Sequence, residues 1–213
     1  MKIYFNRKPV IGPWGGGNKT LIEICKKLQD LNHEVVFDLE ENIDIIFCYD
    51  PRPNSKGVWY QDFLNYKRYF KKCKLIQRVG DVGTHSKPEL TLLLKEIVKN
   101  QFTDHFIFPS LWAKKMIDHD QKNFKIIPNR PLCEFYNNRM IKRNDNNKIK
   151  IITHHWSTNI KKGFDFYEKL GNYSCNNLIN NKKIEISYIG RYPDNFSKKG
   201  LNVIFPIKLK VKV

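Results

Sequence analysis

Short apolar runs bounded by turn residues recur along the chain, and runs of this kind are typical of strands. Six of them precede Pro128: 2–5, 34–37, 43–49, 75–79, 105–108 and 124–127. Three segments space their apolar residues as helices do: 21–31, 90–98 and the segment after Ser110, a natural N-cap. Because strands and helices alternate, we expect a mostly parallel sheet with helices on both faces.

The pattern breaks once and then restarts. Residues 137–147 are polar and poor in apolar side chains, as linkers are. After them, 149–153 and 184–189 are predicted strands, and 164–170 is a predicted helix. We therefore expect a complete Rossmann-like domain over 1–136, a linker over 137–147 and a partial second domain over 148–213.

The second predicted domain is small for its class. A parallel sheet is normally covered on both faces, so half a domain should leave apolar side chains open to water. We expect that open group to be Phe164, Phe166, Ile186 and Tyr188.

The chain is strongly basic, with a formal net charge of +17 at pH 7. This charge fits a polyanionic partner, namely nucleic acid, an anionic membrane surface in peripheral contact, or a phosphate-bearing substrate. It also fits a genome biased toward A- and T-rich codons, because lysine, asparagine and isoleucine crowd the chain, as in 176–184. The lysines are spread rather than gathered on one element, which favours the codon interpretation.

The cysteines and the hydropathy pattern bear on the compartment. The five cysteines form no CxxC pair, which is typical of reduced thiols in a cytosolic protein. No stretch approaches the ~18 apolar residues that a membrane span needs. The N-terminus turns polar too soon for a signal peptide. We expect a cytoplasmic protein with no transmembrane segment.

A glycine-rich turn, 12–18, lies between the first predicted strand and the first predicted helix. Consecutive glycines let backbone N–H groups approach an anion at a helix N-terminus. The spacing is not GxGxxG, and no acidic residue clearly ends the second strand to hold a ribose, which disfavours NAD. A plain flexible connection explains the same residues equally well.

Two groupings resemble metal sites but favour other interpretations. Asp118-His119-Asp120 follows a helix-like segment, so we interpret it as a surface loop. His154 and His155 are adjacent on a predicted strand and should point to opposite faces, so they would not chelate one ion easily. We therefore expect no metal and no cofactor.

Five segments together resemble family-4 glycosyltransferases of the GT-B fold. The first is the glycine turn with its helix and LNHEVVF, which is followed by TDHFIFPSLWAKKMI, KIIPNRPLCEF, IITHHWSTNIKKGFDFYEKL and ISYIGRYPDNF. They occur in the family's order and cover about residues 1–206. The resemblance implies two Rossmann-like lobes that together transfer a sugar, with retention, from a nucleotide-diphosphate sugar to an acceptor.

The resemblance also implies roles for particular residues. In the first lobe, which receives the glycan, lipid or protein acceptor, Gly16 and Gly17 would face the sugar phosphate. In the second lobe, Lys162 would pair with the diphosphate and offset the charge that grows on the departing nucleotide. Lys161 and Gly163 flank it, and Arg191 would lie nearby in the donor site.

The sequence departs from the family at several places. Trp156 stands where an arginine is common, and Asn129-Arg130 replaces the usual Asn-Gly turn. The loop after the fourth strand lacks the family's histidine at Gly80, so Asp81 or His85 is the candidate catalytic polar group at the sugar. The family's paired glutamates have no counterpart here.

The end of the chain admits two interpretations. Residues 207–213 alternate lysine with apolar residues, as an edge strand protected from aggregation does, or as a few frame-shifted codons would. With the second lobe truncated, we expect weak nucleotide binding and no sugar transfer by this chain alone. The alternative function is a non-enzymatic, basic, Rossmann-like module that binds a nucleotide or nucleic acid.

Overall fold

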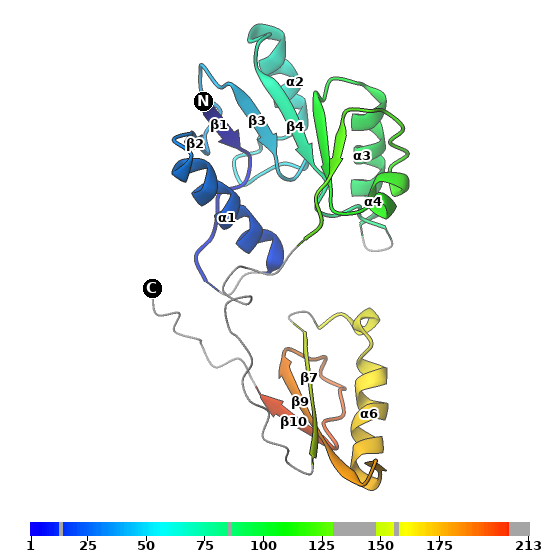
Figure 1. Ribbon diagram of the computed structural model, residues 1–213. Coiled ribbons are helices and arrows are strands. Elements are labelled where there is room, and N and C mark those ends of the chain that lie inside the picture. The colour runs from blue at the N-terminus through cyan, green and yellow to red at the C-terminus, as the bar shows by residue number, and fades with distance from the viewer. Residues whose placement is uncertain (13–14, 85–86, 130–147, 156–157, 205–213) are drawn as a thin grey trace. The chain divides into compact units, whose positions relative to one another are not determined.

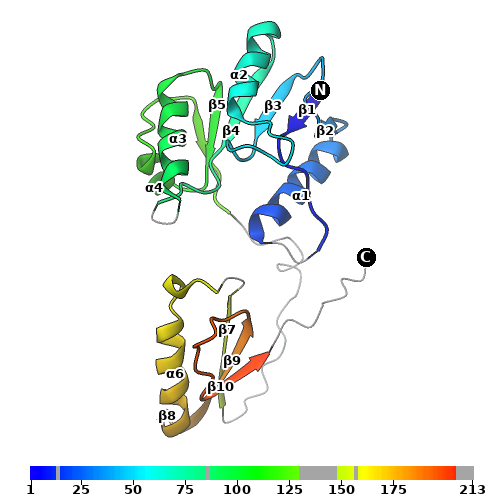
Figure 2. The same ribbon diagram turned by 180° about the vertical axis from the view of Figure 1, so that it is seen from behind.

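The computed structural model describes residues 1–12, 15–84, 87–129, 148–155 and 158–204 of the 213-residue chain. The chain divides into two compact units, Met1–Cys133 and Glu134–Val213 (Figures 1 and 2). Strands and helices alternate in both units, which confirms the expected α/β class. The predicted linker 137–147 and the terminal 207–213 lie outside the described residues.

The first unit is built on one parallel sheet. Its six strands are β1 (Lys2–Phe5), β2 (Glu34–Val36), β3 (Ile45–Cys48), β4 (Lys74–Arg78), β5 (His105–Phe108) and β6 (Phe124–Ile126). They lie in the order β2-β1-β3-β4-β5-β6, and every neighbouring pair is parallel. The six apolar runs before Pro128 therefore all form strands, as the sequence predicted.

Helices cover both faces of this sheet. They are α1 (Gly16–Asp30), α2 (Tyr60–Tyr69), α3 (Pro88–Lys99) and α4 (Leu111–Met116). Successive side chains of a strand point to opposite faces, so Phe5 packs with Leu21 of α1 while Tyr4 packs in the cluster that contains Phe63 of α2. In Figures 1 and 2, α1 lies on one face and α2 and α3 on the other.

Helix α2 has no counterpart among the elements predicted from the sequence. Its buried face is half tyrosine, and those tyrosines bury their rings while their hydroxyl groups find polar partners. The Tyr66 hydroxyl accepts a hydrogen bond from the Ile43 amide at 3.0 Å, and the Tyr60 hydroxyl lies 2.9 Å from the Thr103 hydroxyl. Aromatic residues with polar tips therefore carry the helical periodicity that aliphatic residues carry in the other helices.

The second unit has its own smaller sheet. Its elements are β7 (Lys148–His155), the single 3₁₀ turn η1 (Ile160–Lys162), α6 (Phe164–Asn176), β8 (Leu178–Ile179), β9 (Lys182–Gly190) and β10 (Leu201–Ile204). Strands β10, β9 and β7 lie side by side and parallel, and the short β8 pairs antiparallel with β9. Asn180 and Asn181 both have positive φ (51° and 59°), as the tight hairpin between β8 and β9 requires.

The expected open apolar group of the second unit was wrong for three of its four members. Phe164, Ile186 and Tyr188 are only 3%, 1% and 0% exposed, whereas Phe166 is 60% exposed. The physical reason is that Phe164 of α6 and Tyr188 of β9 pack against each other and against Phe196, so the helix and the segment around Phe196 cover this face of the sheet. In the part of the chain that the structure describes, no helix has the length and apolar character to cross a membrane.

Candidate functional site

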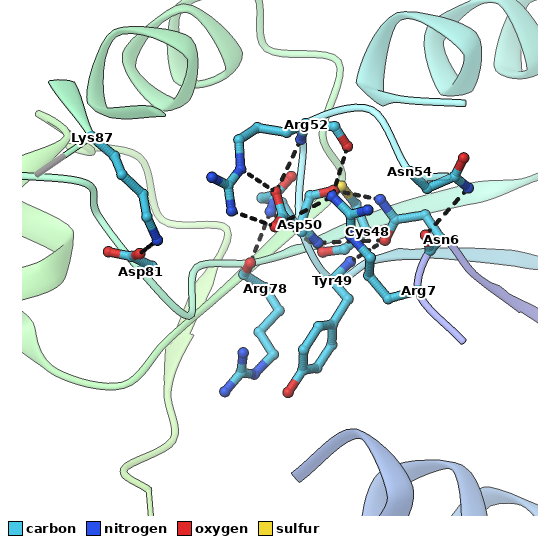
Figure 3. A network of polar contacts seen from close by, with 11 residues as sticks. Asn6, Arg7, Cys48, Tyr49, Asp50, Arg52, Asn54, Arg78, Asp81 and Lys87 are labelled. Atoms are coloured by element: carbon cyan, nitrogen blue, oxygen red, sulfur yellow. Dashed lines mark hydrogen bonds and ion pairs between the residues drawn. The ribbon is translucent and has the colours of Figure 1, made fainter. Parts of the chain in front are cut away.

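The first unit has a topological switch point between β1 and β3. The chain leaves β1 for β2 on one side and then crosses to β3 on the other. In open α/β sheets, ligands bind at the carboxyl ends of the strands at such a point, because the loops there diverge to opposite faces. Asn6 and Arg7 follow β1, and Tyr49 and Asp50 follow β3, so these four residues occupy that place (Figure 3).

Asn6 fixes the loop between β3 and α2. Its side-chain oxygen accepts hydrogen bonds from the Tyr49 amide at 2.8 Å and from the Asp50 amide at 3.4 Å. Its side-chain nitrogen donates to the Asp50 carbonyl. The residue is 1% exposed, so these partners satisfy polar atoms that water does not reach.

Asp50 lies between two arginines. The Nε and Nη2 of Arg52 contact its two carboxylate oxygens at 3.0 and 2.7 Å, and the Nη2 of Arg7 lies 3.3 Å away. Burial acts to raise the pKa of Asp50, but the hydrogen bonds from Arg52 and the charge of Arg7 outweigh it, so this pKa is lowered. Asp50 is therefore an ionised anchor for two guanidinium groups and a poor general base.

Arg78, Tyr49 and the glycine turn meet beside the start of α1. The Arg78 guanidinium stacks over the Tyr49 ring at 4.5 Å, and the Tyr49 hydroxyl donates to the Gly17 carbonyl at 2.6 Å. Gly16 and Gly17 are the first residues of α1 rather than part of a turn before it. An added Cβ at either would meet nothing within 4 Å, so no neighbour in the described chain requires a glycine there.

Asp81 belongs to the loop after β4, at the same edge of the sheet. It pairs with the Lys87 amine at 2.9 Å and accepts a hydrogen bond from the Gly83 amide at 2.9 Å (Figure 3). Burial acts to raise the pKa of Asp81, but these two hydrogen bonds and the charge of Lys87 outweigh it and lower that pKa. The other catalytic candidate, His85, lies outside the described residues.

In the second unit, the predicted donor residues follow β7. Lys161 and Lys162 end η1, and both side chains are exposed. The Asn159 side chain accepts a hydrogen bond from the Lys161 amide at 3.0 Å and so caps the turn. Gly163 has φ 82°, a left-handed conformation that glycine adopts without strain, and it is the N-cap of α6 directly after the turn.

His155, the last residue of β7, links these lysines to Arg191. Its carbonyl accepts a hydrogen bond from the Arg191 amide at 2.9 Å, and its Nε2 lies 2.8 Å from the Tyr167 hydroxyl. Burial lowers the pKa of His155, and the charge of Lys162 lowers it further. Lys162 follows β7 and Arg191 follows β9, so both residues lie at the carboxyl-terminal edge of the second sheet.

The predicted site residues thus form two sets. Gly16, Gly17 and Asp81 belong to the first unit, and residues 161–163 and Arg191 belong to the second. Sequence reasoning missed Asn6, Arg7, Asp50 and Arg52, although an Asp-Pro-Arg-Pro segment directly after a buried strand was the available signal. Among the described residues, no group of three or more His, Cys, Asp or Glu side chains could hold a metal ion.

Comparisons with known proteins bear on the fold. No family model matches the chain, and no curated protein matches it. A solved structure, that of Anabaena Alr3699/HepE in complex with UDP and glucose, matches 96% of this chain and 68% of its own. The two share 12% sequence identity, and the TM-score is 0.52. The chain therefore has an α/β fold of the GT-B type, in which one Rossmann-like unit is followed by another.

Proposed function

We propose that this protein is a glycosyltransferase that transfers a sugar from a nucleotide-diphosphate sugar to an acceptor. The observation that carries the proposal is the fold, shared over 96% of the chain with a protein whose structure holds UDP and glucose. Five sequence segments in the order of family-4 glycosyltransferases support it independently. Retention of the anomeric configuration and an acceptor that is a glycan, a lipid or a protein belong to the same proposal.

The second unit supplies the donor site in this proposal. Lys161, Lys162 and Arg191 gather cations at the carboxyl ends of β7 and β9, where α/β sheets bind ligands. When the bond between the anomeric carbon and the diphosphate oxygen breaks, negative charge grows on the departing nucleotide. The Lys162 ammonium group offsets that charge without a metal ion, and Gly163 lets the chain turn sharply into α6.

The first unit receives the acceptor. Asp81 is ionised and paired with Lys87, so it suits a hydrogen bond to a sugar hydroxyl better than proton abstraction near neutral pH. Gly16 and Gly17 are exposed and leave open space where a side chain would stand, as an approach of the sugar phosphate to the backbone needs.

Calorimetric titration with UDP and GDP tests the proposal. Lys162→Ala should weaken nucleotide binding by about 1–3 kcal/mol, the scale of a lost charge-assisted contact. Lys169→Ala, which removes the same charge from the exposed side of α6, is the matched control and should bind as the unaltered protein does. Equal nucleotide binding by all three proteins would show that Lys162 is not part of the nucleotide site.

Two further measurements separate the alternatives. Steeply salt-dependent binding of an oligonucleotide, with no binding of UDP or GDP, would favour the basic binding module instead. Incubation with a panel of nucleotide sugars, followed by assay of released nucleotide, tests transfer directly. Release above background that Lys162→Ala abolishes would establish transfer and overturn the expectation that this chain is inactive by itself.

A further inference from the structure

The pair of arginines at Asp50 is a part of the first unit that the donor site does not use. Two guanidinium groups, those of Arg7 and Arg52, contact one carboxylate, so the group carries one positive charge in excess. The side chains of Arg7, Arg52 and Asp50 are 28%, 35% and 23% exposed. They are thus held in place and still accessible to a ligand.

Both arginines keep hydrogen-bond donors for a further partner. Arg52 contacts Asp50 through Nε and Nη2, and Arg7 contacts Asp50 and the Arg52 carbonyl through Nη2. A guanidinium group carries five N–H donors. In the part of the chain that the structure describes, the Nη1 groups of both arginines make no hydrogen bond or ion pair.

The backbone around the pair is fixed. Asn6 binds both the amide and the carbonyl of Asp50, and the Asn54 side chain donates to the Asn6 carbonyl at 3.4 Å. Pro51 and Pro53 restrict the same loop. Arginines on such a support lose little conformational freedom when a ligand binds, which favours affinity.

We propose that Arg7 and Arg52 bind a phosphate group on the acceptor, which makes the acceptor an anionic, phosphate-bearing molecule. That the phosphate belongs to an acceptor rests on the proposed function. That the two arginines bind an anion rests on their geometry. A phosphate monoester carries nearly two negative charges and three acceptor oxygens, so it attracts the arginines more strongly than the single carboxylate of Asp50 does. A ligand that carries a carboxylate instead of a phosphate would attract the arginines no more strongly than Asp50 does.

The phosphate can belong to a soluble sugar or to a lipid, and two probes distinguish these sources. Glucose 1-phosphate is titrated by calorimetry in the presence of saturating UDP, which occupies the donor site. Vesicles of phosphatidylcholine with and without phosphatidic acid are tested by co-sedimentation. Binding of the sugar phosphate alone indicates a soluble acceptor. Binding only to vesicles with phosphatidic acid indicates a lipid phosphate. Binding of neither overturns the proposal.

Variants assign the phosphate to the arginines. Arg7→Gln and Arg52→Gln should each weaken binding of the bound probe about tenfold, the effect of one lost contact to a charged group. Arg68→Gln removes the same charge from an exposed site on α2, where the Arg68 side chain donates a hydrogen bond to Asn65, and this variant should bind as the unaltered protein does. An equal effect of all three substitutions would show that binding depends only on the net charge of the protein, and it would overturn the proposal.

A fourth variant distinguishes the loss of a phosphate contact from unfolding of the loop. Arg52→Lys keeps the charge and loses the two-pronged geometry, so its affinity should fall between those of the unaltered protein and Arg52→Gln. Thermal melts of every variant check that the first unit stays folded. UDP titration of the unaltered protein tests the donor site separately. If the unaltered protein binds UDP but neither phosphate probe, this inference alone is contradicted; if it binds a phosphate probe but no UDP or GDP, the proposed function is contradicted.

Discussion

The two units of this protein bury their sheets differently. In the first unit, separate hydrophobic clusters cover the two faces of six parallel strands. In the second, one aromatic cluster covers one face, and the strand residues of the other face are exposed in β7 and half-exposed in β9. The comparison teaches that one face of a parallel sheet can mix polar and apolar side chains: among the described residues, Lys150, Glu185 and Ser187 share this face with Ile152, Ile189 and Ile204.

Register explains the open face of the second sheet. Lys150 pairs with Glu185, and Ile152 pairs with Ser187, so polar side chains stand beside Ile152 on a face that also carries Ile189 and Ile204. Ile152 itself is 69% exposed. Since side chains alternate along a strand, the residues expected to be open, such as Tyr188, fall on the covered face instead.

The largest effect is expected from a substitution at the centre of the aromatic cluster in the second unit. Phe164→Ala should cost about 3–5 kcal/mol, the usual range for a buried phenylalanine, and should unfold the second unit while the first stays intact. Hydrogen exchange measured by mass spectrometry should then show lost protection over 148–204 with protection of β1 to β6 unchanged. Loss of protection in both units together would contradict the independence of their cores.

A smaller effect is expected at the buried polar support of the first unit. Asn6→Ala leaves the Tyr49 and Asp50 amides without their partner and should cost about 1–3 kcal/mol in chemical denaturation. Amide exchange should quicken at these two residues first. Asn65→Ala, at an exposed position on α2, is the control and should change stability by less than about 0.5 kcal/mol.

Each unit contains a histidine whose protonation folding opposes. His119 is 4% exposed among Phe106, Phe108 and Phe124, and burial, with the charge of Lys114, lowers its pKa. Burial and then Lys162 lower the pKa of His155. The unfolded chain binds these protons as the pH falls below about 6.5, whereas the folded chain resists them. Stability should therefore be fully present above that pH and decline below it.

Substitution separates the two contributions to this pH dependence. His119→Phe should flatten the acid decline of the first unit alone, and His155→Phe should flatten that of the second. The measurement is the midpoint of chemical denaturation between pH 7 and pH 5, followed by signals specific to each unit. A decline that neither substitution alters would assign the effect to other groups.

The smallest expected effect compares the same change on a buried and an open face. Ile46→Val, at a position 0% exposed in β3, should cost about 0.5–1.5 kcal/mol. Ile152→Val, on the open face of β7, should change stability by less than about 0.5 kcal/mol. Equal costs would mean that the open face of the second sheet is covered in solution.

The sequence by itself determined most of the order of strands and helices, because local apolar periodicity and turn residues specify those elements, but it did not predict α2, β8 or β10. All six strands of the first unit and the restart after residue 147 follow from that pattern. The placement of Lys161, Lys162 and Gly163 at a turn between strand and helix followed in the same way. Helix α2 was not predicted because tyrosines form much of its buried face, and a tyrosine can be counted as either polar or apolar in a periodicity pattern.

Only the tertiary structure decided which residues meet at the sheet edges and which face of the second sheet is covered. Asn6 and Asp50 lie 44 positions apart, and they meet because β1 and β3 are adjacent in the parallel order. The buried state of Phe164 and Tyr188 depends on where α6 and Phe196 pack, which the local pattern does not specify. Contacts between distant segments arise from strand order and packing, and these depend on the whole fold.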